Sequence, residues 1–358
     1  MRESQNPFSI SFGLPPVRYV ARLEQTNDII VDFSNNISSG HVFMITGVRG
    51  CGKTVLLSTV SSELKKADNW VVIDLNPNRD MLQALAGKLY GEKGIHQQFR
   101  DAKIDLSAFG LGVSIKGADP VTDIEAALFR MISLLEKQKR KLLITVDEAT
   151  NNKNVRAFTS SFQSMLREKL PVFLLMTGLY DHINNLQNEK TLTFLYRAPK
   201  IMLGPLNLYA IKTEYQHVFD ISAEMAVMMT KLTKGYSFAF QVLGYLCWKH
   251  GGTELTDDEI RSRIIPQYDQ YLEEYAYEKI WSELHKPDRK LLTAMAKHEK
   301  ADIPILRTEL EMSPQLFYKY RKRLSMQGIL SETDEDRLDF VLPRFKEYIL
   351  RRELFYGE

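Results

Sequence analysis

The chain has 358 residues, of which 44% are hydrophobic and 26% are charged, and its formal net charge is +2. This composition excludes disordered and collagen-like proteins and allows two or three domains with hydrophobic cores. A nearly neutral charge argues neither for nor against a nucleic-acid partner. Charged residues interrupt every apolar run before the roughly 18 residues that a membrane span needs, and the first residues lack the apolar segment of a secretory signal. We therefore expect a cytoplasmic protein with no membrane partner.

The cysteines and histidines predict neither a disulfide nor a structural metal site. The two cysteines, Cys51 and Cys247, are too few for a disulfide framework or a zinc set, and we expect both to be reduced. The seven histidines show no HExxH motif or other ligand spacing. Any metal ion is therefore expected to arrive with a nucleotide.

Residues 41–66 carry the first motif. The apolar, β-branched run at 41–46 predicts a strand, and the apolar spacing at 54–66 predicts a helix. Between them, Gly47 is followed by four residues and then by a Gly-Lys-Thr triplet that begins at Gly52, which is the spacing of a phosphate-binding P-loop. A glycine-rich turn with a chance lysine is the alternative.

The P-loop pattern assigns a role to its residues. Glycines let the backbone turn tightly, so that its N–H groups point at phosphate oxygens beside the positive end of the following helix. Lys53 is expected to neutralise the β- and γ-phosphates, and the Thr54 hydroxyl is expected to ligate Mg²⁺. The predicted nucleotide contacts are Gly47, Val48, Arg49, Gly50, Cys51, Gly52, Lys53, Thr54 and Val55.

Strands and helices alternate after the P-loop. Residues 69–77 predict a second strand, and residues 122–138 predict a helix in which Thr122 and Glu125 have the spacing of a capping box. Apolar residues that alternate with small ones at 104–117 indicate an inserted strand or hairpin, used either for close packing or for contact with a partner. The order predicts an α/β fold with a doubly wound parallel sheet, whose ligand lies at the carboxyl ends of the strands.

The second half of the predicted site follows an apolar run at 142–146. This run predicts a strand buried on both faces, and it ends in Asp147 and Glu148. An aspartate at this place can hold the Mg²⁺ shell, and the adjacent glutamate can activate the attacking water. A structural acidic cap is the alternative, which the upstream P-loop disfavours. A further predicted strand, within residues 170–181, leads to Thr177.

In this order, the motifs resemble those of AAA+ and STAND P-loop ATPases, and most closely those of prokaryotic ATPases related to origin-recognition initiators. The resemblance extends over most of the chain. It implies ATP and Mg²⁺ as cofactors, slow hydrolysis of ATP to ADP and phosphate, and a homo-oligomer as one option. The segment before the first helix resembles the family's adenine-contacting Gly-Arg-Glu sequence, with Ala21 at the glycine position. This likeness assigns nucleotide contacts to Val20 and Arg22.

Three further features have roles only through the resemblance. Thr177 falls where the family has its first sensor, a polar side chain between the glutamate and the γ-phosphate. Arg197 matches an arginine near the γ-phosphate or a neighbouring subunit's site, and a surface arginine that caps a helix is the alternative. Residues 232–251 resemble the helical lid, but where STAND relatives show Gly-x-Pro this chain has Gly-Tyr-Ser from Gly235. The resemblance therefore implies a lid at this place in the chain, but it does not imply the family's contact between the proline and adenine.

From about residue 276 the pattern changes to three short helices followed by a wing-like turn and strand, an order that resembles a winged-helix domain. Its recognition-type helix spans 313–327, with Ser313 as N-cap and Pro314 in the first turn. Basic residues on this helix suit DNA phosphates, and Gln315 suits base edges. The cations and tyrosines of the helix are Lys319, Arg321, Lys322, Arg323, Tyr318 and Tyr320.

The predicted wing is acidic and would repel a phosphate backbone, so a winged helix that contacts protein instead of DNA stays open. Its acidic residues are Asp334, Glu335, Asp336 and Asp339.

The sequence thus predicts a P-loop ATPase domain at 1–206, a helical lid at 207–275 and a winged-helix domain at 276–358. The first hypothesis is an ATP-hydrolysing switch that couples its nucleotide state to DNA or protein contacts through the winged helix. The alternative is a DNA-binding initiator-like or transposition-helper protein whose ATP site regulates assembly on DNA. The Asp-Glu pair and the winged helix disfavour a small-molecule kinase.

Overall fold

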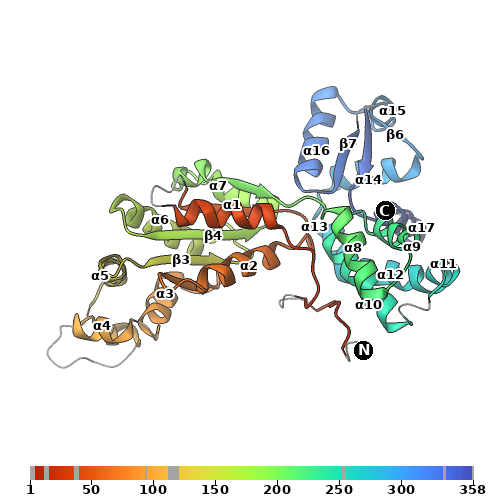
Figure 1. Ribbon diagram of the computed structural model, residues 1–358. Coiled ribbons are helices and arrows are strands. Elements are labelled where there is room, and N and C mark those ends of the chain that lie inside the picture. Colours follow the sequence, from red (N-terminus) through yellow and green to blue (C-terminus); the bar gives the residue numbers. More distant parts are fainter. Residues whose placement is uncertain are drawn as a thin grey trace. The chain divides into compact units, whose positions relative to one another are not determined.

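The computed structural model describes residues 5–11, 16–35, 40–92, 95–111, 121–251, 255–333 and 336–356. The chain divides into two compact units, which are described separately (Figure 1). The sheet unit comprises Leu23–Thr46 and Lys53–Met202. The helical unit comprises Met1–Arg22, the P-loop segment Gly47–Gly52 and Leu203–Glu358. The division into three domains stays a prediction.

The sheet unit is built on five parallel strands in the order β2-β3-β4-β1-β5. The strands span Val42–Thr46 (β1), Trp70–Leu75 (β2), Lys141–Val146 (β3), Val172–Gly178 (β4) and Lys200–Met202 (β5). The predicted α/β class and the four strands predicted from apolar runs are confirmed. The sequence does not predict β5, because two of its three residues are exposed and they form no apolar run.

Helices connect these strands, as expected of a doubly wound sheet. They span Leu23–Ser34 (α1), Lys53–Lys65 (α2), Met81–Tyr90 (α3), His96–Asp101 (α4), Ile124–Lys137 (α5), Lys153–Arg167 (α6) and Tyr180–Gln187 (α7). Short 3₁₀ helices span Ser107–Phe109 and Thr193–Arg197.

One local prediction is wrong in this unit. The capping box at Thr122 does not form, because the neighbouring Asp123 is the N-cap of α5 and its carboxylate accepts from the Glu125 N–H (2.9 Å). Of the strand or hairpin predicted at 104–117, residues 104–111 are described and include a 3₁₀ turn over Ser107–Phe109, whereas residues 112–117 lie outside the described residues.

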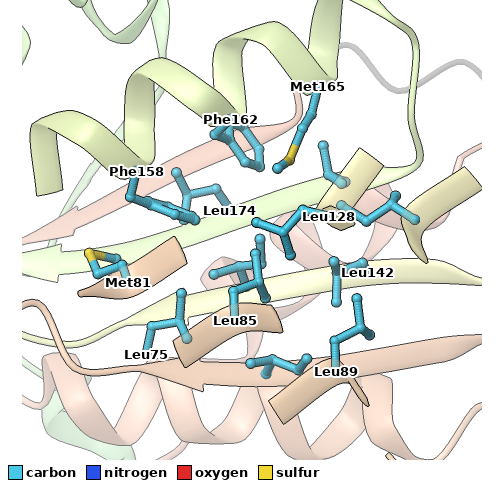
Figure 2. Close-up of a cluster of buried hydrophobic side chains, with 14 of the residues drawn as sticks. Leu75, Met81, Leu85, Leu89, Leu128, Leu142, Phe158, Phe162, Met165 and Leu174 are labelled. Carbon is cyan, nitrogen blue, oxygen red and sulfur yellow. The ribbon is translucent and has the colours of Figure 1, made fainter. Parts of the chain in front are cut away.

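The central strands β1, β3 and β4 are buried on both faces: alternate side chains point to opposite sides of the sheet, and all of their residues but Lys141 are buried. On one face, Leu142 of β3 and Leu174 of β4 pack with Leu85, Leu128 and Phe158 of α3, α5 and α6 (Figure 2).

On the other face, Phe33 of α1 packs with the aromatic residues Phe43, Trp70 and Phe173 of three strands. Packing on two sides supports the strand ends that carry the predicted site.

The helical unit begins with six α-helices. They span Leu208–Phe219 (α8), Ala223–Thr233 (α9), Ser237–Lys249 (α10), Asp257–Glu259 (α11), Ile265–Leu272 (α12) and Glu278–Glu283 (α13), with π-helical turns at Ile260–Ile264 and Glu273–Tyr277. Phe8, from the N-terminal segment, is buried among Tyr215, Phe219 and Phe240. Gly244 leaves room for this ring, since an added Cβ would lie 2.5 Å from it.

The C-terminal part of the helical unit combines four helices with a small antiparallel sheet of order β6-β8-β7. Its elements are Lys286–Lys297 (α14), Ala301–Asp302 (β6), Ile303–Glu309 (α15), Pro314–Met326 (α16), Leu330–Thr333 (β7), Arg337–Phe340 (β8) and Phe345–Tyr356 (α17). The predicted cap is confirmed, because the Ser313 hydroxyl accepts from the Leu316 N–H (3.3 Å). Asp334 and Glu335 lie outside the described residues, and the winged-helix assignment stays a prediction.

Across the described ranges, the helices are each too short or too polar to cross a membrane.

Candidate functional site

Asp147 is the centre of a linked polar group in the sheet unit. It directly follows β3, and its Oδ2 accepts a hydrogen bond from the Thr54 hydroxyl at the start of α2 (2.8 Å). Its Oδ1 accepts from the hydroxyl of Thr177 near the end of β4. Parallel strands end at one edge of a sheet, and this is why residues far apart in the sequence meet there. The predicted metal-binding residues Thr54 and Asp147 are thus neighbours in space.

Thr177 also binds the backbone of Glu148, the residue that follows Asp147. Its hydroxyl accepts from the Glu148 N–H (3.1 Å), and its carbonyl accepts from the Ala149 N–H (2.7 Å). Glu148 has a φ of +54°, a left-handed conformation that costs a glutamate of order 1 kcal/mol. Its side chain is exposed, whereas Thr177 is fully buried. A strained backbone held by a buried hydroxyl fixes the direction in which Glu148 leaves the strand.

The P-loop segment, in the helical unit, has the backbone that its glycines were expected to allow. Gly50 and Gly52 have φ values of +71° and +96°, which only glycine adopts at little cost. A Cβ added at Gly50 would lie 2.5 Å from the Tyr236 hydroxyl oxygen, so this position has no room for a side chain. Tyr236, which lies in the predicted lid, therefore packs directly on the loop.

Three consecutive residues at the start of α10 hold three consecutive carbonyls of the P-loop. The Tyr236 hydroxyl donates to Arg49 O (2.6 Å), the Ser237 hydroxyl to Cys51 O (3.0 Å) and the Phe238 N–H to Gly50 O (3.0 Å). Complete burial raises the pKa of Tyr236 far above its usual range, so its hydroxyl stays protonated and donates. The sequence predicts a lid at residues 232–251, but it does not indicate that Tyr236 and Ser237 bind the loop.

These contacts orient the loop for an anion. In a planar trans peptide the C=O and the following N–H point in opposite directions. Carbonyls turned toward the lid therefore turn the N–H groups of Gly50 and Gly52 away from it, while the Cys51 N–H bonds Val48 O within the loop (3.3 Å). Outward N–H groups before a helix form an anion-binding nest, so the loop geometry fits a nucleotide phosphate.

Arg22, which was expected to contact adenine, forms hydrogen bonds to the P-loop and to Gly204. Its Nη2 donates to Cys51 O (3.0 Å) and to Gly204 O (2.7 Å), and burial lowers the pKa of its guanidinium. Val20 is buried, at 9% exposure. The adenine contacts assigned to Val20 and Arg22 stay predictions.

Gln241 of α10 holds the segment that precedes Arg22. Its Nε2 donates to Arg18 O (2.7 Å), and its Oε1 accepts from the Ser9 N–H (2.9 Å). No motif indicated this residue, because its partners lie more than 200 positions away in the sequence.

The remaining predicted residues are placed as follows. Lys53 and Val55 lie in the first turn of α2 and are half-buried, and Val48 and Cys51 are buried in the loop. Arg197 ends the 3₁₀ helix after α7 and is exposed, and its role near the γ-phosphate stays a prediction.

Two of the four cations predicted to contact DNA form ion pairs within the helical unit. Arg321 contacts Glu332 of β7 (2.6 Å), and Arg323 contacts the fully buried Asp288 of α14 (2.5 Å). Lys319 and Lys322 are exposed on α16. The basic character of the helix is therefore partly structural.

Two family models match parts of the chain. One is described as the KAP family P-loop domain and matches residues 21–153, from the first helix to the acidic pair after β3. The other is a domain of unknown function, DUF8462, and matches residues 274–349. No curated protein matches the chain.

Solved structures share the fold at low sequence identity. The ORC2 protein of Aeropyrum pernix in ADPNP–ADP complexes has a TM-score of 0.59 and 14% identity, over 96% of this chain and 98% of that one. Its ADP form has a TM-score of 0.50 and 15% identity, over 96% of each chain. Cdc6p of Pyrobaculum aerophilum has a TM-score of 0.47 and 14% identity, over 96% of this chain and 98% of that one. The chain therefore has a P-loop NTPase fold, which it shares with the A. pernix ORC2 protein.

Proposed function

We propose that the chain binds ATP with Mg²⁺ and hydrolyses it slowly, as a switch of the AAA+ or STAND type. The observation that carries the proposal is the linked group around Asp147, in which Thr54 and Thr177 bond the two oxygens of one carboxylate. Carboxylate and hydroxyl oxygens suit Mg²⁺, which prefers hard oxygen ligands. Thr54 also lies in the first turn of α2, directly after Lys53, so the proposed metal and phosphate ligands are adjacent in the chain.

Each residue of the site has a distinct task in this proposal. The N–H groups of Gly50 and Gly52 bind phosphate oxygens, and Lys53 neutralises their charge. Thr54 and Asp147 hold the Mg²⁺, which when bound neutralises charge that develops on the γ-phosphate.

Glu148 is the proposed general base for the attacking water. Its exposed carboxylate and its fixed backbone suit this role, because a base must be held in one direction to accept a proton. Arg197 is proposed to stabilise the charge of the transition state, in the same chain or in a neighbouring copy. The A. pernix ORC2 protein with the shared fold is described in complexes with ADPNP and ADP, which agrees with an adenine nucleotide as ligand.

The second candidate function is that of a DNA-binding, initiator-like or transposition-helper protein whose ATP site regulates assembly. The exposed Gln315, Lys319 and Lys322 on α16 favour it. In either case we propose that a winged helix at 276–358 transmits the nucleotide state to its partner. That partner is double-stranded DNA or a protein in the cytoplasm.

Glu148→Gln tests the proposal. The amide keeps the shape and hydrogen-bonding of the side chain but cannot act as a base, so we expect single-turnover hydrolysis to fall at least about 10²-fold while Mg-ATP affinity is retained. Glu168→Gln is the control: Glu168 is another exposed glutamate, at the end of α6, and this variant should hydrolyse ATP like the wild type. Lys53→Ala should lose ATP affinity in calorimetry. Wild-type hydrolysis by Glu148→Gln would show that the chain has another base, and unchanged ATP affinity in Lys53→Ala would refute the P-loop assignment.

A further inference from the structure

The side chain of Arg49 connects the P-loop to α13. Its Nε donates to Glu283 Oε2 (3.0 Å) and its Nη2 donates to Glu283 Oε1 (2.6 Å). This bidentate pair fixes the orientation of the guanidinium relative to the carboxylate. Lys279 lies 3.4 Å from the same carboxylate. Burial by itself would raise the pKa of Glu283, but the hydrogen bonds and charge of Arg49, with the charge of Lys279, outweigh it and hold the pKa below its usual range. The pair is therefore ionised at neutral pH.

The neighbouring loop residue, Val48, lies near a second part of the same segment. Gly328 follows α16 with a φ of +77°, and a Cβ added there would lie 3.8 Å from the Val48 backbone nitrogen. Glu283 and Gly328 both fall within residues 274–349, the segment matched by the domain of unknown function. Arg49 thus bonds this C-terminal segment and Val48 lies close to it, all within the helical unit.

The loop is consequently held on two sides by contacts that involve only the protein itself. The start of α10 fixes the carbonyls of residues 49–51, and Glu283 fixes the side chain of Arg49, whose own carbonyl is the first of the three. A loop that is already ordered loses less conformational entropy when it binds its ligand. Contacts that order the loop should therefore appear as nucleotide affinity.

We propose that Glu283 is a positioning residue for the P-loop: through Arg49 it holds the phosphate-binding conformation, so that the C-terminal segment 274–349 raises the affinity of the chain for ATP. The inference rests on the proposed ATP site. Because coupling between two sites is reciprocal, bound ATP also strengthens the hold of the segment on the loop.

Calorimetry of Mg-ATP binding to the full chain tests the role of Glu283. Glu283→Gln keeps the shape of the side chain but removes the negative charge that Arg49 binds. We expect this variant to bind ATP about 5-fold more weakly, which is the lower end of the typical range for coupling between two sites. The turnover rate at saturating ATP should change by less than about 2-fold, because the contact is expected to be equally strong in the ATP-bound state and in the transition state. Glu278→Gln is the matched control: Glu278 lies on the same helix, but its carboxylate bonds Arg352 (3.0 and 3.1 Å) instead of the P-loop. It should bind ATP like the wild type.

Two further measurements separate positioning from general damage to the fold. In an Arg49→Gln background, Glu283→Gln should cause no further loss of affinity, because its effect passes through Arg49. Amide hydrogen exchange in α13 and α14 should slow when ATP is added to the wild type and should not respond in Glu283→Gln. Glu283→Asp keeps the charge but shortens the side chain, so it should also weaken the binding of ATP. This variant replaces Glu283→Gln in the test if Glu283→Gln does not fold.

The outcomes distinguish the inference from the proposed function. Wild-type affinity in Glu283→Gln, an equal loss in Glu278→Gln, or a further loss in the Arg49→Gln background would each overturn the positioning role while leaving the ATP site intact. A wild-type chain that binds no ATP would overturn the proposed function and this inference together.

Discussion

At the scale of single residues, Thr177 connects the carboxylate of Asp147 to the backbone of Glu148, the two residues on which hydrolysis is proposed to depend. Its hydroxyl donates to Asp147 and accepts from the Glu148 N–H, and it is fully buried. Thr177→Val keeps the shape and removes both bonds. We expect hydrolysis to fall roughly 10-fold or more, because small displacements of reacting groups cost rate, while Mg-ATP affinity changes little.

The control for Thr177→Val is Thr159→Val, which removes a buried threonine hydroxyl from α6, where it bonds Val155 O (2.7 Å). Both variants should lose unfolding free energy: about 1 kcal/mol for Thr159→Val, and about 2 kcal/mol or more for Thr177→Val, whose two lost bonds include one to a carboxylate. Only Thr177→Val should impair hydrolysis. Equal turnover in the two variants would show that Thr177 supports the fold and not the reaction.

At the scale of elements, the packing of α16 on α14 depends on a buried ion pair. Asp288 has a side chain with 0% exposure, and its Oδ1 accepts two bonds from Arg323. Its Oδ2 has no hydrogen-bond partner within the described part of the chain. Arg323→Ala should therefore lower the free energy of unfolding by about 3 kcal/mol, because it leaves a buried carboxylate without its cation.

Denaturant unfolding of Arg323→Ala and Arg321→Ala checks this expectation. Arg321 lies on the same helix, but its partner Glu332 is 47% exposed, so its loss should cost no more than about 1 kcal/mol. Equal losses would show that burial of Asp288 does not decide the stability of the contact. A DNA-binding test that includes Arg323→Ala would confuse unfolding with lost phosphate contacts.

At the scale of the whole molecule, the two candidate functions differ in whether α16 binds DNA. Lys319→Ala with Lys322→Ala leaves the internal ion pairs of α16 in place and should flatten the dependence of log affinity on log salt by about one unit for each lost phosphate contact. Lys65→Ala with Lys66→Ala removes the same charge from the exposed end of α2 and should leave the slope unchanged. The measurement is duplex DNA binding over a salt series, with and without Mg-ATP. Equal slopes in both double variants would leave a protein as the partner of α16.

The sequence by itself determined the features that depend on neighbours along the chain. The P-loop spacing, the apolar runs of four strands, the acidic pair after β3 and the Ser313 cap were predictable, because each is a pattern within a few residues. The same local reasoning failed at Thr122, where the adjacent Asp123 serves as the cap instead. It also missed β5, whose pairing with β1 supplies what its three residues do not show.

Only the tertiary structure decided which groups meet across long distances in the sequence. Tyr236 lies 187 positions from Arg49, Glu283 lies 234 positions from it, and Arg323 lies 35 positions from Asp288. Tyrosines, arginines and carboxylates are frequent and form partners of many kinds, so their types alone do not select a pair. Burial and the exclusion of water select it, because a polar group taken out of water must find a partner wherever the fold places one.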